Sequence, residues 1–274
     1  MKSKLIFFFL MLCSTSFAQQ RQEIVLSDNW QFSHDRQQWQ TVSVPHDWAI
    51  AGPFDKKWDL QVVRIEQNGE KEATEKSGRS GALPWIGEGY YRRNLPIPSD
   101  FKGRAELLFD GAMAEPTVFV NGKKAGYWAY GYNAFRVDIT DFINTQSAQN
   151  LLEVSLQNLP ESSRWYPGAG IYRPVTLILT GNSHIDDWGI YTQTIKIHQG
   201  TKDIAELSVE VPIVNKQPGM SVGLALFDAD GKEIAHVMPA PMRNGKVSTR
   251  FLIPNAKLWS PENPYLYKLV AKLC

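Results

Sequence analysis

Short runs of alternating or β-branched apolar residues recur along the chain, each bounded by Gly, Pro, Asn or Asp. The clearest are EIVLSDNWQF, WQTVSVP, RAELLFDG, PTVFVNG, LLEVSLQN and PVTLILTG. Apolar positions at a period of two predict strands with one buried face, and no long stretch shows the spacing of an amphipathic helix. Only residues 138–143 (DITDFI) predict a helical turn. The pattern therefore predicts an all-β fold.

The pattern also predicts one hairpin and a set of core positions. Asn121 and Gly122 stand between TVFV and KKAGYW, and both residues tolerate the positive φ of a two-residue hairpin turn. The residues predicted to lie in the core are Phe109, Val118, Phe119, Val120, Phe135, Val137 and Ile139.

Two breaks interrupt the rhythm of strands. Residues 61–82 are polar, charged and rich in Gly, which predicts a long loop, either solvated or functional. Near residues 181–183 the composition changes, and the strand-like runs that follow have the spacing of an immunoglobulin-like sandwich. We therefore expect one domain over residues 19–182 and a second, smaller sandwich over residues 183–274.

The end of the second predicted sandwich has two notable features. Trp259, before SPENPYLY, is interpreted as an anchor at the start of a strand. The sequence ends at Cys274 within a strand-like run. A sandwich that lacks its closing strand exposes an unpaired edge, which natural proteins avoid, so we expect this domain to be incomplete and the chain to be a piece of a longer one.

Residues 1–18 have the features of a secretory signal peptide. Lys2 and Lys4 precede an apolar run over residues 5–12, and a small-x-small cleavage site ends at Ala18. The run is too short to span a bilayer. We expect export to a periplasm or beyond; lipid attachment at Cys13 is the alternative, although Leu12 is a poor fit to the small residue needed before it.

Charge and cysteine content exclude several classes of function. The net charge is +1 over 274 residues, which offers no electrostatic footprint for nucleic acid or an anionic membrane. The two cysteines, Cys13 and Cys274, form no Cys/His cluster with the spacing of zinc ligands. We therefore expect no nucleic-acid partner, no metal and no other cofactor.

The stretch SSRWYPGAGIYRPV, residues 162–175, joins aromatic side chains to a Pro-Gly-x-Gly turn. Such a turn lets the backbone double back. Arg164 supplies forked donors for hydroxyls or a carboxylate, and Trp165 offers an apolar face to the C–H side of a sugar ring. The corner, with Tyr166, is interpreted as the rim of a pocket, as a surface packed on another domain, or as a simple surface corner.

Five stretches occur in an order that resembles one family. They are VSVPHDWAI, GEGYYRRNLPIP, residues 107–143, SSRWYPGAGIYRPV and LWSPENPYLYKL. Together they closely resemble the amino-terminal part of glycoside hydrolase family 2, and the PHDW and SSRWYPGAGIYR forms look most like its β-galactosidase branch. The resemblance implies a jelly-roll sugar-binding domain, an immunoglobulin-like sandwich and then a catalytic (α/β)8 barrel, which is missing from this sequence.

The resemblance implies that this chain carries no catalytic residue. Retaining glycoside hydrolysis needs two carboxylates about 5 Å apart. The family's acid/base is the Glu of an Asn-Glu pair in the barrel, and no Asn-Glu dipeptide occurs here. We expect the non-catalytic amino-terminal part of a β-galactosidase-like enzyme, inactive alone, whose partners are a galactoside, the barrel and possible further copies in a homo-oligomer. The alternative is a free-standing carbohydrate-binding protein.

The family's jelly-roll loops help to wall the sugar pocket of the barrel, which implies a set of substrate-binding residues. These are Arg164, Trp165, Tyr166, Trp85 and Glu88. Interdomain packing is the alternative for the first three, and a solvated charge is the alternative for Glu88. His46-Asp47-Trp48 is interpreted as structural, with Asp47 accepting backbone N–H bonds after Pro45 and Trp48 filling the core.

Overall fold

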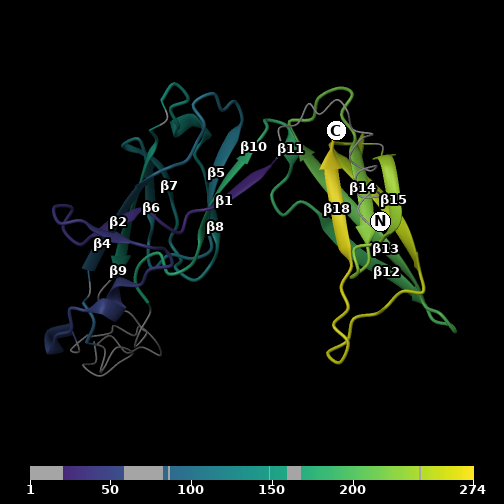
Figure 1. Ribbon diagram of the computed structural model, residues 1–274, viewed down its shortest axis with the longest axis horizontal. Coiled ribbons are helices and arrows are strands. Elements are labelled where there is room, and N and C mark those ends of the chain that lie inside the picture. The colour runs from purple at the N-terminus through teal and green to yellow at the C-terminus, as the bar shows by residue number, and fades with distance from the viewer. Residues whose placement is uncertain (1–20, 59–82, 86, 148, 159–167, 241) are drawn as a thin grey trace, which may run out of the picture. The chain divides into compact units, whose positions relative to one another are not determined.

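The computed structural model describes residues 21–58, 83–85, 87–147, 149–158, 168–240 and 242–274 (Figure 1). This part of the chain forms two compact units, residues 21–179 and 180–274, both built from antiparallel strands. Its helical elements are three 3-10 turns, η1 (Trp48–Ala51), η2 (Lys56–Trp58) and η3 (Thr140–Phe142). The all-β prediction and the helical turn within residues 138–143 are therefore confirmed. No helix among these residues is long and apolar enough to cross a membrane.

The first unit contains a six-stranded sheet in the order β3-β2-β4-β9-β6-β7. Its strands are β2 (Trp30–Ser33), β3 (Gln40–Val42), β4 (Gly87–Asn94), β6 (Thr117–Val120), β7 (Lys123–Tyr127) and β9 (Leu151–Asn158). A four-stranded sheet in the order β1-β10-β5-β8 completes the unit. Its strands are β1 (Gln22–Val25), β5 (Arg104–Phe109), β8 (Phe135–Asp138) and β10 (Val175–Thr180).

The core of the first unit lies between these two sheets. Trp30, Phe32 and Tyr91 come from the six-stranded sheet, and Leu107 and Leu177 come from the other; all five belong to one buried cluster. Trp30 is fully buried and donates from Nε1 to the carbonyl of Leu26 at 2.6 Å. A core that draws large side chains from both sheets is what defines a sandwich, so the predicted jelly-roll domain is observed.

The hairpin prediction is confirmed, and the core prediction is confirmed with one exception. Asn121 and Gly122 have φ values of 52° and 76° and join β6 to β7. Val118 and Val120 are fully buried, whereas Phe119 between them is only partly buried. Side chains of successive strand residues point to opposite faces, so Phe119 lies on the outer face of the sheet and its assignment to the core was wrong.

The second unit is a smaller sandwich. One sheet has the order β11-β13-β17-β16 with β12 also paired to β13, and the other has the order β15-β14-β18. The strands of the first are β11 (His184–Ile185), β12 (Tyr191–His198), β13 (Ile204–Val214), β16 (Met242–Arg243) and β17 (Lys246–Pro254). Those of the second are β14 (Val222–Phe227), β15 (Glu233–Ala240) and β18 (Lys268–Leu273).

The core of the second unit is more aliphatic than that of the first. Val209, Val211, Val222, Leu224 and Val247 are its most buried members, drawn from both sheets. This arrangement confirms the predicted immunoglobulin-like sandwich. The absence of a closing strand stays a prediction.

Trp259 does not anchor a strand. It lies between β17 and β18, outside either strand, and its side chain is 59% exposed. The prediction was wrong because a Trp before a turn gives no information on whether the sheet covers it; here the last strand begins only at Lys268.

Candidate functional site

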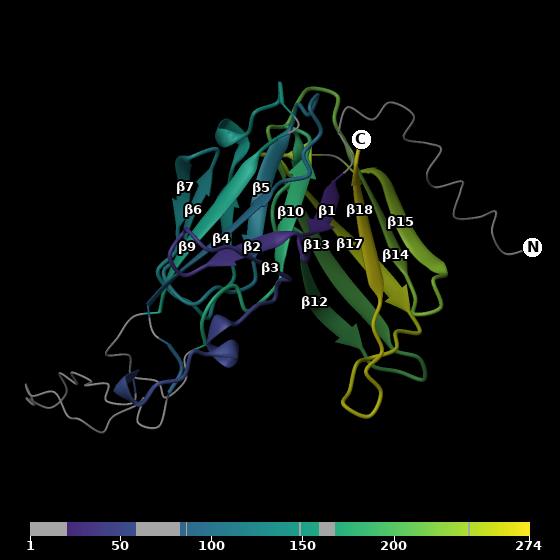
Figure 2. The same ribbon diagram turned by 60° about the vertical axis from the view of Figure 1, so that its left-hand side comes forward.

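Several connections gather at one end of the first unit, which we call the loop end. It consists of residues 43–58, 83–85, 110–116, 128–134 and 168–174. Backbone pairing brings these segments together: Met113 pairs with Gly170, Ala114 with Gln157, and Phe54 with Pro84. The 3-10 turns η1 and η2, drawn in blue, lie beyond this end of the sandwich (Figure 2). Loops on a rigid scaffold are where binding residues concentrate.

The corner at Gly168 and Gly170 is held tightly at the loop end. Their φ values are 84° and 98°, a region that glycine adopts without steric cost. A Cβ at Gly170 would collide with the Tyr91 hydroxyl and lie 2.6 Å from the carbonyl oxygen of His46. The Gly170 N–H donates to the Met113 carbonyl at 2.8 Å, and the His46 N–H donates to the Ile171 carbonyl at 2.8 Å. The predicted glycine turn is therefore observed for these two residues.

An aromatic cluster surrounds Trp48 beneath the loop end. The ring of Trp48 stacks on Phe32 with centroids 5.4 Å apart, and Trp85 lies edge-on to it at 6.2 Å. Asp47 caps η1, because its Oδ1 accepts the Ala49 N–H at 3.0 Å. Trp48 is 1% exposed. The structural interpretation of Asp47 and Trp48 is therefore confirmed.

His46 and Tyr91 form a hydrogen bond next to the corner. Nδ1 of His46 lies 2.7 Å from the Tyr91 hydroxyl. Burial lowers the pKa of His46, against the opposing charge of Asp47, and burial raises the pKa of Tyr91 well above its usual value. The neutral form of each side chain is therefore favoured at pH 7, and their hydrogen bond links β4 to the segment beside the corner.

The predicted site residues fall into three groups. Arg164, Trp165 and Tyr166 lie outside the described residues. Trp85 lies at the loop end, partly buried, with its ring 4.2 Å from that of His34. Glu88 lies on the outer face of the sheet, exposed, where its carboxylate accepts a hydrogen bond from Tyr90. The binding role of all five residues stays a prediction.

A group of exposed aromatic side chains at the loop end escaped the sequence analysis. Tyr127, Trp128, Tyr130 and Tyr132 are between 38% and 56% exposed. Trp128 stacks on Phe135 at 5.8 Å, and the rings of Tyr130 and Tyr132 are 5.5 Å apart. We call these four residues the aromatic loop. Four aromatic residues within GYWAYGY were the available signal, because exposed aromatic clusters mark binding surfaces.

The Asp55 carboxyl at the loop end has a lowered pKa, because it accepts the backbone N–H of Lys57. A general acid needs a raised pKa, so this carboxyl is not suited to that role. No group of three or more His, Cys, Asp or Glu is placed to hold a metal ion in the described ranges.

Comparisons with known proteins agree with this architecture. The sequence model of the sugar binding domain of glycosyl hydrolases family 2 matches residues 13–181, and a second model of glycosyl hydrolases family 2 matches residues 183–274. A β-galactosidase of Bacteroides ovatus, BoGH2A, is 32% identical over 244 residues, which are 86% of this chain and 26% of that protein. A β-glucuronidase of Bacteroides fragilis is 28% identical, with 97% of this chain and 37% of that protein covered.

A solved structure shows the same fold. A glycosyl hydrolase family 2 member from Bacteroides cellulosilyticus superposes with a TM-score of 0.73 at 27% identity, with 92% of this chain and 33% of that chain covered. The matched family models place these two sandwiches in a family of glycosidases. It belongs to glycosyl hydrolase family 2, of which it represents an amino-terminal, non-catalytic portion. It spans between 26% and 37% of the length of these relatives.

Proposed function

We propose that this chain belongs to an exported glycosidase that hydrolyses β-galactosides, and that its loop end contributes to the wall of the sugar pocket. The observation that carries the substrate is the 32% identity to the Bacteroides ovatus β-galactosidase. The β-glucuronidase of Bacteroides fragilis is 28% identical, so a β-glucuronide is the second candidate substrate. The reacting carboxylates of this mechanism lie in a catalytic domain of the longer protein.

The rim is built around the glycine corner. Gly170 forms two backbone hydrogen bonds with Met113, and the His46 N–H donates to the carbonyl of the next residue, Ile171. The corner that follows Arg164, Trp165 and Tyr166 in the sequence is thus held on both sides. A guanidinium and an indole at such a rim would bind sugar hydroxyls and the apolar face of the ring. Remote binding energy of this kind is used to position the reacting bond.

Substitution of the rim in the longer enzyme tests this role. We expect Trp165→Ala to raise KM or to lower kcat several-fold, because the sugar loses an apolar contact that orients it. Steady-state kinetics on 4-nitrophenyl β-galactoside and 4-nitrophenyl β-glucuronide measure both the effect and the substrate preference. Unchanged kinetics in a normally folded variant would contradict the proposed role of Trp165 in the rim. A preference for the glucuronide would contradict the galactoside as the proposed substrate.

A free-standing carbohydrate-binding protein is the second candidate function. The observation that favours it is the aromatic loop, whose exposed rings could stack on sugars without a catalytic domain. Isothermal titration of the chain with galactosides separates the two: we expect no saturable binding, because a rim without a pocket floor buries little of a ligand. The mass of the native gene product distinguishes them as well, since a protein that contains both this chain and a catalytic domain is much larger than 31.0 kDa.

Export and assembly complete the proposal. Cleavage after Ala18 would give a mature protein that begins at Gln19, which amino-terminal sequencing detects. A lipid on Cys13 would appear as a mass increase instead. Association into a homo-oligomer would appear in sedimentation of the longer protein.

A further inference from the structure

The aromatic loop presents the outer end of a stack of rings. The rings of Phe109 and Phe135 are parallel within 2° with centroids 4.8 Å apart, and the ring of Trp128 is parallel to that of Phe135 within 8° at 5.8 Å. Phe109 is fully buried and Phe135 is 3% exposed, whereas Trp128 is 38% exposed. The stack therefore runs from the core to the surface and ends in the partly exposed indole of Trp128.

The aromatic loop is fixed by hydrogen bonds and close contacts. The backbone N–H of Trp128 donates to the Pro116 carbonyl at 3.0 Å. The Tyr172 hydroxyl donates to the Gly131 carbonyl at 2.9 Å, and a Cβ at Gly131 would lie 2.5 Å from Sδ of Met113. An aromatic surface that is already ordered loses little conformational entropy when it binds a ligand.

The hydrogen bond from Tyr172 also joins the aromatic loop to the glycine corner. Tyr172 follows Gly170 by two residues, and Gly170 pairs with Met113. Since an extended chain spans at most about 3.6 Å per residue, the Cα atoms of Gly170 and Tyr172 lie within about 7 Å of each other. The aromatic loop thus adjoins the candidate rim at the loop end.

The polar atoms and the charge of the aromatic loop favour an uncharged ligand with hydroxyl groups. Nε1 of Trp128 and the hydroxyl of Tyr130 have no hydrogen-bond partner among the described residues, so both can bond to a ligand. Residues 126–135 (GYWAYGYNAF) contain no Asp, Glu, Lys or Arg, so this segment offers a charged sugar no ion-pair partner. Rings with polar tips suit a ligand that has an apolar face and hydroxyl groups, as a sugar ring has.

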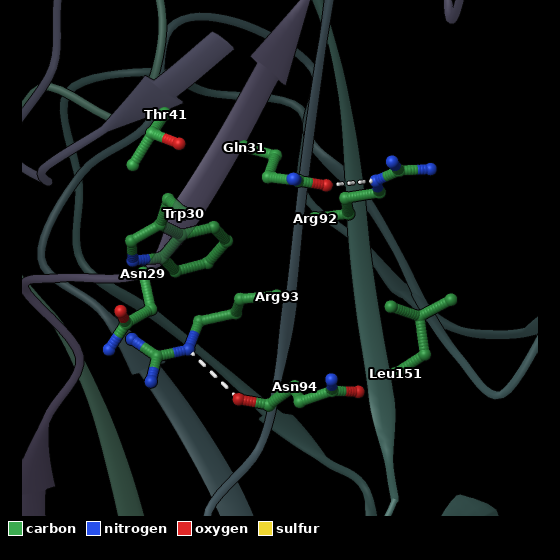
Figure 3. Close-up of a pocket in the computed structure, with 8 residues that line it drawn as sticks. All are labelled: Asn29, Trp30, Gln31, Thr41, Arg92, Arg93, Asn94 and Leu151. Carbon is green, nitrogen blue, oxygen red and sulfur yellow. Dashed lines mark hydrogen bonds between the residues drawn. The ribbon is translucent and has the colours of Figure 1, made fainter. Parts of the chain in front are cut away.

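A pocket elsewhere in the first unit has different chemistry. It lies on the outer face of the six-stranded sheet, has a volume of about 330 Å³, and is lined in part by Gln31, Arg92 and Asn94 (Figure 3). Arg92 Nε donates to Oε1 of Gln31 at 2.7 Å, and Arg93 Nε donates to the Asn94 carbonyl at 3.2 Å (Figure 3). Among the described residues that line this pocket, only Trp30 is aromatic, and it is fully buried. This pocket therefore offers no exposed ring on which a sugar could stack.

We propose that the aromatic loop binds uncharged sugar units of the substrate beyond the unit whose bond is cleaved, with one sugar ring stacked on the exposed indole of Trp128. This inference rests on the proposed glycosidase function and specifies the substrate as an oligosaccharide or polysaccharide. The rings of Tyr130 and Tyr132, with centroids 5.5 Å apart, extend the binding surface beyond one ring. Binding energy gained here holds the substrate without contact to the reacting bond.

Kinetics of the longer enzyme on a long and a short substrate test the proposal. β-1,4-Galactotetraose has sugar units to place on the aromatic loop, whereas 4-nitrophenyl β-galactoside has only the sugar that is cleaved. We expect Trp128→Ala to lower kcat/KM for the tetraose about tenfold, mainly through a higher KM, and to change kcat/KM for the nitrophenyl galactoside less than about twofold. Tyr130→Ala should lower kcat/KM for the tetraose as well. Trp128→Phe should keep most of the activity on the tetraose, because phenylalanine retains an aromatic face.

The comparison of the two substrates separates lost binding from lost folding. A variant that folds poorly loses activity on both substrates alike, whereas loss of the aromatic surface lowers activity on the tetraose alone. Trp259→Ala, at a tryptophan that is 59% exposed in the second unit, is the matched control and should change neither. An equal fall on both substrates in Trp128→Ala and Tyr130→Ala, or an unchanged kcat/KM for the tetraose in both, would overturn the proposal.

A binding assay distinguishes failure of this proposal from failure of the proposed hydrolase function. In native gels that contain soluble β-1,4-galactan, the longer protein should migrate more slowly than in gels without it, and Trp128→Ala should migrate faster than the unaltered protein. Such retardation without hydrolysis of either substrate would support the aromatic loop as a binding surface and contradict the hydrolase function alone. No retardation of the unaltered protein would overturn the inference, even if the nitrophenyl galactoside is hydrolysed.

Discussion

Two eight-residue strands, one in each unit, bury their side chains in opposite ways. Along β9 (Leu151–Asn158) every second residue is buried, because one face of the strand packs on the core. Along β12 (Tyr191–His198) all eight residues are exposed. Tyr191, Ile195 and Ile197 are each at least 40% exposed although they are large and apolar.

The difference indicates how far each unit stabilises itself. The first unit encloses its large apolar side chains between two sheets, as an independent domain does. An exposed apolar edge strand is a feature that natural proteins cover or blunt. We therefore expect β12 to be covered by another part of a longer protein or by a partner, and the first unit to need no such cover.

The largest effect should come from the core of the first unit. Trp30 is fully buried and hydrogen-bonded to Leu26, so Trp30→Ala should lower the free energy of unfolding by about 3–5 kcal/mol. Leu252→Ala, at a position 64% exposed in the second unit, should change it by less than about 0.5 kcal/mol. Urea titrations followed by circular dichroism measure the free energy of unfolding of both variants. Equal losses in the two variants would contradict the expected difference between the units.

Buried charge should give the next largest effect. Glu106 is 2% exposed and forms ion pairs with Arg104 and Arg136. Glu106→Gln removes a buried carboxylate partner from each of the two guanidinium groups and should cost about 3 kcal/mol. The matched control is Glu210→Gln in the second unit, which breaks an exposed pair with Lys246 at 2.8 Å and should cost less than about 1 kcal/mol. Similar costs for the two variants would contradict the assigned burial.

Acid should destabilise the first unit through its histidines. Burial lowers the pKa of both His34 and His46 below the usual 6.5. The unfolded chain then binds more protons than the folded one between the lowered values and 6.5, so stability falls as the pH falls through this window. Urea unfolding at pH 7.5 and 5.5 should show this loss, with a smaller loss in His46→Gln. A first unit that is equally or more stable at pH 5.5 would refute the prediction.

The smallest effect on folding should come from β12. Ile197 is 40% exposed, so Ile197→Ser should change the free energy of unfolding of the chain by less than about 0.5 kcal/mol. Self-association measured by sedimentation should decrease, because the apolar edge is the expected contact. A loss of stability comparable to that of Trp30→Ala would show that β12 packs on the core of its own unit.

The sequence pattern was enough to predict the strands and turns, but it could not show which face of each strand is covered by the rest of the protein. Alternation located β6 and β9, and Asn121-Gly122 located a hairpin, because both signals are local. Phe119 and Trp259 were misjudged because burial depends on which face meets the other sheet. The family motifs pointed to the corner at Gly168 and Gly170, and the structure supplied the contacts that fix it.

The pocket at Arg92 could not be predicted from the sequence. Gln31 and Arg92 are separated by 61 positions and meet only through the pairing of β2 with β4. Strand register is set by the packing of the whole sheet. The aromatic loop, by contrast, was visible as a dense run of Tyr and Trp, and only its exposure was unknown.

The most direct test of the account is a hydrolysis assay that compares residues 19–274 with the longer gene product on 4-nitrophenyl β-galactoside and 4-nitrophenyl β-glucuronide. We predict that the longer protein hydrolyses at least one of them, and that the chain alone releases no nitrophenol above the buffer rate. Saturable turnover by the chain alone would contradict its assignment as a non-catalytic portion of a family 2 glycosidase.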